Sequence, residues 1–157
     1  MFIEFLGAVW RRLPGFARRR LVRTGQRRFT VTAGALIFDE QDRILLLEHV
    51  FRPDRGWGIP GGFLNKAEQP EAALRRELRE EIGIELADVS MLFTRALTKP
   101  RQIEIYFRAR AIGRPVPCSF EIRSAGWFSF ADLPPELSED QRRLIRRALT
   151  PSENSLQ

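Results

Sequence analysis

The stretch Gly61–Ile84, GGFLNKAEQPEAALRRELREEIGI, determines how the rest of the chain is interpreted. It places Glu77, Glu80 and Glu81 at positions i, i+3 and i+4, which share one face of a helix with 3.6 residues per turn. Three neighbouring carboxylates repel one another, whereas hard divalent cations such as Mg²⁺ prefer oxygen ligands. The spacing therefore predicts a metal-binding helix face.

The same stretch carries signals for both ends of that helix. Gln69-Pro70 predicts its start, because proline is tolerated in the first turn, where its missing N–H would have no partner. Gly83 predicts its end, because glycine readily takes the left-handed conformation that closes a helix. An apolar stripe lies beside the acidic face and consists of Leu74, Leu78 and Ile82. One side of the helix is therefore expected to be buried while the other side faces a ligand.

Residues 62–84 fill the pattern Gx5Ex7REUxEExGU, where U is a bulky aliphatic residue, and in this the chain resembles the Nudix hydrolase family. The nine matching positions are Gly62, Glu68, Arg76, Glu77, Leu78, Glu80, Glu81, Gly83 and Ile84. The alternative is an ordinary amphipathic helix with a solvated Glu/Arg face. The flanking pattern extends the resemblance to most of residues 30–149. It implies an α/β fold, a Nudix-like α/β/α sandwich with a mixed sheet between helices.

The resemblance also implies an activity, namely hydrolysis of a pyrophosphate bond in a nucleoside diphosphate linked to another moiety. Glu77, Glu80 and Glu81, with the carbonyl of Gly61, would hold Mg²⁺ or Mn²⁺. Glu77 is the first candidate for the general base, and Glu121 is the second. Arg76 is expected to orient a neighbouring glutamate through a charge-assisted hydrogen bond, and Glu68 to hold the junction between loop and helix.

Substrate contacts are expected just before this stretch. Arg52 and Arg55 are candidates for gripping a phosphate, and Trp57 for stacking on a base. Solvated loop arginines and a core tryptophan are the competing interpretations. Glu104 is a weaker candidate for an acid at the site.

Length and composition indicate a single cytoplasmic domain with an appended segment. The chain has 157 residues, 43% of them hydrophobic and 29% charged, and its one cysteine excludes an internal disulfide. Eight arginines and one glutamate fall within residues 1–30, which leaves 18 of the 26 basic and 19 of the 20 acidic residues for the remainder. We therefore expect a basic helical arm at 1–28, a Nudix domain at 29–150 and a frayed tail at 151–157.

The arm has three interpretations. Its apolar residues recur at helical spacing and are interrupted at Pro14, which predicts two short helices. The favoured interpretation packs the arm on the domain or on a second copy, giving a homodimer, because its apolar side chains are costly to leave in water. Contact with a membrane surface and contact with nucleic acid are the other two. No apolar run approaches the length of a transmembrane helix.

Strands are expected at 29–38, 43–50, 89–98, 102–112 and 124–130, and a final helix after Ser138. Ser138 and Gln141 have the spacing of a capping box, in which each side chain bonds the other residue's backbone N–H.

Two rival functions remain beside hydrolysis of a small nucleotide. Hydrolysis at an RNA 5′ end is disfavoured by the nearly neutral body, so no stable nucleic acid complex is expected. A non-catalytic nucleotide sensor is disfavoured by the complete motif.

Overall fold

A computed structural model describes residues 2–51 and 56–149 of the chain. The expected tail at 151–157 and the two loop arginines, Arg52 and Arg55, lie outside these residues. The elements follow in the order α1 (Phe2–Arg12), α2 (Gly15–Gly25), β1 (Thr30–Phe38), β2 (Ile44–His49), β3 (Trp57–Gly58), β4 (Gly61–Phe63), α3 (Pro70–Ile82), β5 (Glu85–Thr98), β6 (Arg101–Ile112), β7 (Ile122–Phe128) and α4 (Glu139–Leu149).

One mixed sheet contains all of these strands. Its central path is β3-β2-β1-β6-β5, with β4 paired to β1 and β7 paired to β2. Strands β1 and β6 run parallel over their register from Thr30–Gln102 to Phe38–Arg110, and the other pairs are antiparallel. The strands expected from sequence are all present. Strands β3 and β4 were expected to be loop and are additions, because two and three residues rich in glycine carry no strand pattern.

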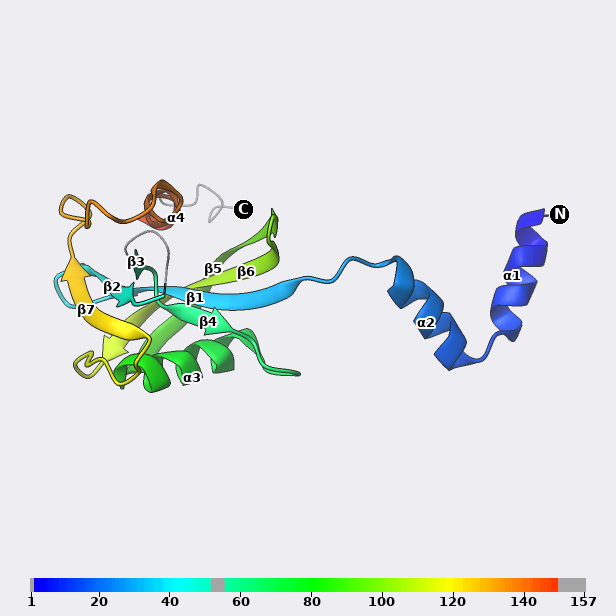
Figure 1. Cartoon of the computed structure of the whole chain (residues 1–157), viewed down its shortest axis with the longest axis horizontal. Helices are drawn as coiled ribbons and strands as arrows, with labels where there is room; N and C mark the ends of the chain where they lie inside the picture. Colours follow the sequence, from blue (N-terminus) through cyan, green and yellow to red (C-terminus); the bar gives the residue numbers. More distant parts are fainter. Residues whose placement is uncertain (1, 52–55, 150–157) are drawn as a thin grey trace.

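Helices α3 and α4 cover opposite faces of this sheet (Figure 1). Side chains alternate along β1, so Ala35 and Ile37 face α3 while Leu36 and Phe38 face α4. Both sets are buried, which explains why the strand sequence is apolar throughout rather than alternating. The sequence prediction of an α/β/α sandwich with a mixed sheet between helices is confirmed.

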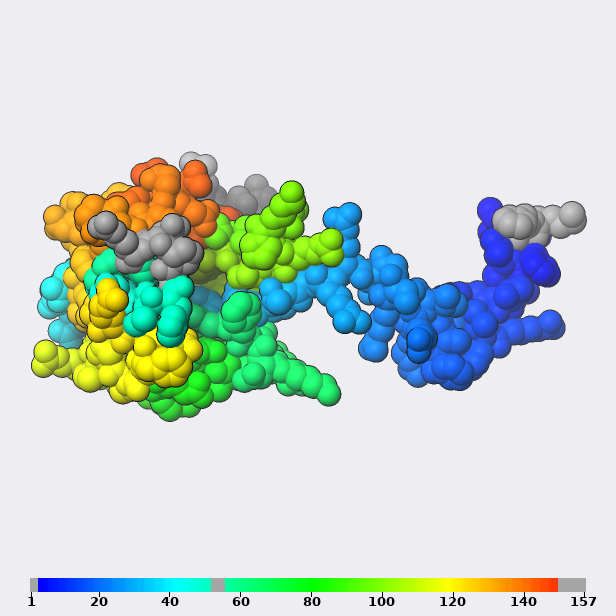
Figure 2. Space-filling view, in the orientation of Figure 1, coloured from blue at the N-terminus to red at the C-terminus, as the bar shows by residue number. Residues whose placement is uncertain are grey.

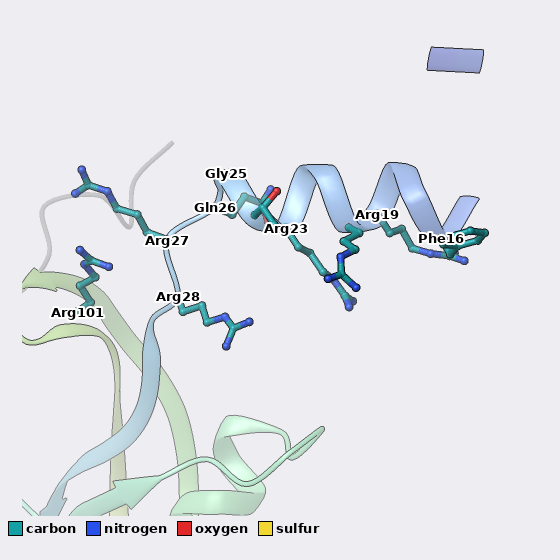
Figure 3. A pocket seen from close by; sticks show the side chains of 10 residues that line it. Phe16, Arg19, Arg23, Gly25, Gln26, Arg27, Arg28 and Arg101 are labelled. Carbon is teal, nitrogen blue, oxygen red and sulfur yellow. The ribbon is translucent and has the colours of Figure 1, made fainter. Parts of the chain in front are cut away.

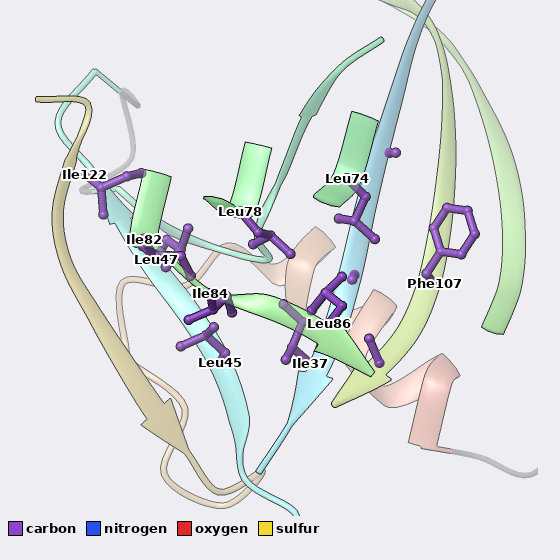
Figure 4. Packing of buried hydrophobic residues seen from close by; sticks show 13 residues of the cluster. Ile37, Leu45, Leu47, Leu74, Leu78, Ile82, Ile84, Leu86, Phe107 and Ile122 are labelled. Atoms are coloured by element: carbon purple, nitrogen blue, oxygen red, sulfur yellow. The ribbon is translucent and has the colours of Figure 1, made fainter. Parts of the chain in front are cut away.

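The cluster beneath α3 fixes the helix that carries the acidic residues. Leu74, Leu78 and Ile82 are fully buried in one cluster with residues of the sheet that include Ile37 of β1 and Leu47 of β2 (Figure 4). This confirms the predicted apolar stripe. The opposite side of the helix is thereby turned outward, in a position set by the core.

The expected ends of α3 are also confirmed. Gln69 is the residue that precedes the first helical turn, and Pro70 occupies that turn. Gly83 ends the helix with φ of 67°, and its N–H donates to the carbonyl of Arg79. Glycine is required there because a side chain is strained in this conformation.

Only half of the expected capping box at the start of α4 is formed. The Oγ of Ser138 accepts the backbone N–H of Gln141 at 3.3 Å. The side chain of Gln141 does not reach back, because its Oε1 instead accepts the N–H of Ile59 at 3.0 Å. Gln141 therefore ties α4 to the segment between β3 and β4.

The N-terminal arm forms two helices that meet at Pro14, as its sequence predicts. The favoured interpretation allowed packing on the domain or on a second copy. Packing on its own domain is wrong, whereas packing on a second copy stays a prediction. Helix α2 has no buried residues, Ile3 and Phe5 on α1 are 82% and 65% exposed, and both helices project away from the sheet (Figure 1). None of the helices described in the structure is long and apolar enough to cross a membrane.

Candidate active site

Glu77 lies directly over the backbone of Gly62. A Cβ atom placed on Gly62 would lie 2.5 Å from Oε1 of Glu77 and 2.6 Å from its Cγ, far inside ordinary van der Waals contact. Gly62 belongs to β4, which pairs with β1, so the sheet determines where this glycine lies. The absence of a side chain at Gly62 therefore allows a carboxylate from α3 to rest against the strand.

Gly61, the residue before, also occupies a position that only glycine fits. Its φ is 151°, and a Cβ there would collide with the carbonyl oxygen of Ala33 on β1. The two glycines thus let the backbone of β4 approach both β1 and Glu77. The carbonyl of Gly61 as a metal ligand stays a prediction.

Arg76 connects the acidic residues of α3 to the preceding loop. Its Nε and Nη2 donate to Glu68 at 2.9 and 3.0 Å, and its Nη1 donates to Glu77 at 2.9 Å and to Glu80 at 3.3 Å. A further bond runs from Nη2 to the carbonyl of Phe63 at 3.1 Å. Arg76 therefore holds α3, the loop and β4 together while partly neutralising three carboxylates.

These contacts shift the titration of both main partners. The hydrogen bonds from Arg76 lower the pKa of Glu68 from its ordinary value of 4.5 to about 2, assisted by the backbone N–H of Asn65 at 2.8 Å. The bond to Glu68 raises the pKa of Arg76 above its ordinary value. Both groups are therefore charged throughout the physiological pH range.

The other two acidic candidates differ in burial. The side chain of Glu80 is 60% exposed, whereas Glu81 is buried and only 8% exposed. Within residues 2–51 and 56–149, no three carboxylate, imidazole or thiol side chains are already gathered around one point. The donor set still suits a hard divalent cation, because carboxylate and carbonyl oxygens are the ligands that Mg²⁺ prefers, and the Gly62 position already brings Glu77 to the backbone.

A pocket of about 200 Å³ opens on the α4 side of the same glycines. Its walls are formed by Thr32, Ala33, Gly34, Ile59, Pro60, Gly61, Gly62, Phe63, Gln102, Glu104, Tyr106 and Gln141. Glu77 and this pocket thus meet at β4 from opposite sides. A substrate seated in the pocket would extend past Gly61 and Gly62 toward the acidic face of α3.

A polar network fixes the floor of this pocket. Glu104 accepts hydrogen bonds from Gln102 at 3.0 Å and from the hydroxyl of Tyr106 at 3.2 Å, and it is ion-paired with Arg95. Arg95 in turn donates to both oxygens of Asp140 on α4, at 2.9 and 2.6 Å. The network therefore joins β5, β6 and α4 around one carboxylate.

The charges of this network reinforce one another. The hydrogen bonds to Asp140 raise the pKa of Arg95, and the same contact lowers the pKa of Asp140. Burial raises the pKa of Tyr106, so its hydroxyl stays protonated and donates to Glu104. Glu104 is consequently committed to orienting pocket side chains, which disfavours it as a general base.

The remaining sequence candidates lie elsewhere. Glu121 is exposed at the turn before β7, where its carbonyl accepts the N–H of Val50 at 2.8 Å. The same loop reaches α3, because Cys118 donates its N–H to the carbonyl of Glu81 at 2.8 Å. Trp57 is half-buried on β3 and packs edge-on against Phe128, with ring centroids 5.0 Å apart. A structural role therefore accounts for Trp57, and base stacking by it stays a prediction.

Among the residues that line the pocket, sequence reasoning singled out Gly61, Gly62 and Glu104 but not Gln102 or Gln141. Gln102, Glu104 and Tyr106 alternate along β6 and so share one face, which was an available signal. Nothing in the sequence around Gln141 indicated that it lines the pocket, because its hydrogen bond with Ile59 joins residues 82 positions apart.

Comparison with known proteins identifies the class to which this fold and site belong. A family model of the NUDIX domain matches residues 28–148. The chain belongs to the Nudix hydrolase family.

Among solved structures, the chain is similar to the MutT NUDIX hydrolase from Burkholderia pseudomallei, with 29% identity, a TM-score of 0.68, and coverage of 79% of this chain and 100% of the other. An ADP-ribose pyrophosphatase from Streptococcus suis is 26% identical, with a TM-score of 0.58 and coverage of 78% and 94%. These similarities support the α/β/α fold described above.

Two curated relatives have names that refer to RNA. The NAD-capped RNA hydrolase NudC of Deinococcus radiodurans is 36% identical over 91 residues, which are 56% of this chain and 32% of that protein. The m7GpppN-mRNA hydrolase dcap-2 of Caenorhabditis elegans is 30% identical over 121 residues, which are 69% of this chain and 15% of that protein. The chain thus spans a third or less of the length of these relatives.

Proposed function

We propose that this protein hydrolyses the pyrophosphate bond of a nucleoside diphosphate linked to another moiety, with a small nucleotide as substrate. The observation that carries the proposal is the meeting of Glu77 and the pocket at Gly61 and Gly62. One side offers carboxylates suited to a cation, and the other offers a cavity with hydrogen-bonding walls. A diphosphate that spans the two glycines would contact both.

The proposed ligands of the divalent cation are the carbonyl of Gly61 and the carboxylates of Glu77, Glu80 and Glu81, with Mg²⁺ or Mn²⁺ as the ion. When bound, such an ion neutralises phosphoryl oxygens and lowers the pKa of a bound water. Glu80 is exposed and accepts one bond from Arg76 at 3.3 Å, whereas Glu77 is bonded to Arg76 at 2.9 Å and also rests against Gly62. Glu77 therefore provides the fixed carboxylate of the proposed set.

Glu77 is also our first candidate for the general base. Its Oε1 accepts the bond from Arg76, which fixes the orientation of the carboxylate and leaves the second oxygen available to accept a proton from water. Arg76 acts as a positioning residue in this scheme, since its partners are carboxylates and a backbone carbonyl. Glu121 is the second candidate, because its loop contacts the end of α3.

The pocket under α4 is the proposed site for the nucleoside portion. Its volume of about 200 Å³ lies below the range of roughly 300–1,000 Å³ that encloses a drug-sized ligand. It therefore admits one ring system and leaves the phosphates outside, toward α3. Gln102, Gln141 and Glu104 supply the polar groups that would select the ring.

The proposal is tested by turnover of a panel of nucleoside diphosphate derivatives with Mg²⁺ and with Mn²⁺, with the products separated by chromatography. Glu80→Gln should lower the rate by about 10²-fold or more, since even the residues that support metal ligands contribute 10–100-fold. Glu71→Gln is the matched control, because Glu71 lies on the same helix but pairs with Arg75 at 2.8 Å. Equal rates for Glu80→Gln and Glu71→Gln would refute the proposed metal face.

Hydrolysis at an RNA 5′ end is the second candidate, favoured by the names of the two curated relatives. Adding capped and triphosphorylated RNA to the same panel separates the candidates. Preference for RNA by at least about tenfold, with the steep salt dependence of phosphate contacts, would replace the small-nucleotide proposal. Binding of nucleotides without any turnover would instead indicate a sensor.

A further inference from the structure

The arm presents an apolar helix face to solvent. On α1, Ile3, Phe5, Leu6, Val9 and Trp10 are between 40% and 82% exposed. Ile3, Leu6 and Trp10 are spaced three and four residues apart, as are Phe5 and Val9, so both rows fall on one side of the helix. The two rows form a continuous apolar face, and Arg11 lies on the opposite side. Helix α1 is therefore amphipathic.

The second helix and the linker that follows it carry charge of one sign. Six arginines line an open pocket with a volume of about 880 Å³, where α2 and its linker approach the body (Figure 3). They are Arg19, Arg20, Arg23, Arg27, Arg28 and Arg101. Glu4 is the one acidic residue among residues 1–28. Arg101 shows that the basic surface continues onto the body, at the start of β6.

We propose that this arm docks the enzyme on the surface of an anionic phospholipid membrane. The apolar face of α1 would lie in the interface, and the arginines of α2 and the linker would contact headgroup phosphates. Stable membrane attachment generally needs two signals, such as an apolar element together with a polybasic patch, and the arm supplies both in adjacent helices.

The alternatives explain only part of the arm. A nucleic acid would neutralise the arginines but leave the apolar face of α1 in water. A second copy of the chain would bring together two arms of equal positive charge, while the body, with 18 basic and 19 acidic residues beyond residue 30, offers little to balance them. The body itself does not cover the face, because the arm stands apart from it (Figure 2). A bilayer accommodates both features at once.

The test is co-sedimentation of the full-length protein with phosphatidylcholine vesicles, with and without phosphatidylglycerol. One variant, Phe5→Ser/Leu6→Ser, removes apolar contacts and keeps every arginine. The other, Arg19→Gln/Arg23→Gln, removes charge and keeps the apolar face. All four positions are exposed, so the fold of the domain is not at risk. Met91→Ser, on the exposed surface of β5, is the control for removing an apolar side chain elsewhere.

We expect binding to anionic vesicles to exceed binding to neutral ones by about tenfold or more, and each arm variant to lose most of it while Met91→Ser keeps it. Hydrolytic turnover in the absence of vesicles should be the same for all variants. Several results would overturn the proposal: no vesicle binding, equal binding to both vesicle types, unchanged binding by Phe5→Ser/Leu6→Ser, or a stable dimer in light scattering that this variant dissociates. Binding to single-stranded RNA with none to vesicles would assign the arm to nucleic acid instead.

Discussion

The contact between Gly62 and Glu77 predicts the effect of adding a single methyl group at position 62. In Gly62→Ala the new Cβ would lie 2.5 Å from Oε1 of Glu77, whereas ordinary contact begins at 3.4 Å. The carboxylate must therefore move by about 1 Å. Glu77 is a half-buried side chain with three rotatable bonds, so the helix itself need not shift.

Activity and stability should respond very differently to that displacement. Misplacing a reacting group by about 1 Å costs on the order of 10²-fold in rate, which corresponds to about 2.7 kcal/mol in the activation barrier. Stability should change by less than about 1 kcal/mol, because the crowded atoms belong to a flexible side chain rather than to the core. We expect kcat to fall and the Mg²⁺ concentration needed for half-maximal rate to rise.

The assay is turnover at varied Mg²⁺, together with urea unfolding of the same variant. Gly25→Ala serves as the control, since a Cβ there meets nothing within 4 Å. If Gly62→Ala retained activity within about threefold of the parent while folded, the placement of Glu77 against β4 would have no role in catalysis. A loss of activity that merely tracks a loss of folded protein would refute the reasoning equally.

Three further predictions concern stability and are read from urea unfolding midpoints. Arg76 lowers the pKa of Glu68 from 4.5 to about 2, so the stability that this ion pair contributes is present above pH 4.5 and is lost as the pH falls from there toward 2. Glu68→Gln should therefore flatten the acid loss of stability in that window. Parallel pH profiles would contradict this. Leu78→Ala should cost about 2–5 kcal/mol with an unchanged denaturant slope, since Leu78 is fully buried under the sheet. Ser138→Ala should cost about 1 kcal/mol by removing the cap on the N–H of Gln141, and a neutral result would show that water replaces it.

The parts of the fold that could be predicted are those specified by neighbours in sequence. The ends of α3 follow from Pro70 and Gly83, and its buried side follows from the spacing of three aliphatic residues. Strand β4 could not be predicted in this way. Its three residues are defined by pairing with Thr32, Ala33 and Gly34, some thirty positions earlier, and not by their own propensity.

The candidate site likewise has one part that local sequence predicts and one part that only the folded chain assembles. The identity and spacing of the glutamates on α3 are local and were evident in the sequence. The pocket is assembled from β1, β6, α4 and the segment around β4, and its polar network joins Arg95 to Asp140 across 45 residues. Which moiety accompanies the diphosphate depends on that assembled wall, so the motif predicts the reaction more readily than the substrate.

The charge balance of α3 modifies the sequence-based explanation of its acidic face. From the sequence, we expected bound cations alone to relieve the repulsion among Glu77, Glu80 and Glu81. In the structure the guanidinium of Arg76 contacts Glu77 and Glu80 through one nitrogen, and Glu68 through the other two. Part of the repulsion is therefore offset within the protein, at a position that also orients Glu77. A residue that supplies countercharge and geometry together explains why arginine, with its rigid fork of donors, precedes the first of these glutamates, since lysine would supply the charge without fixing the carboxylate.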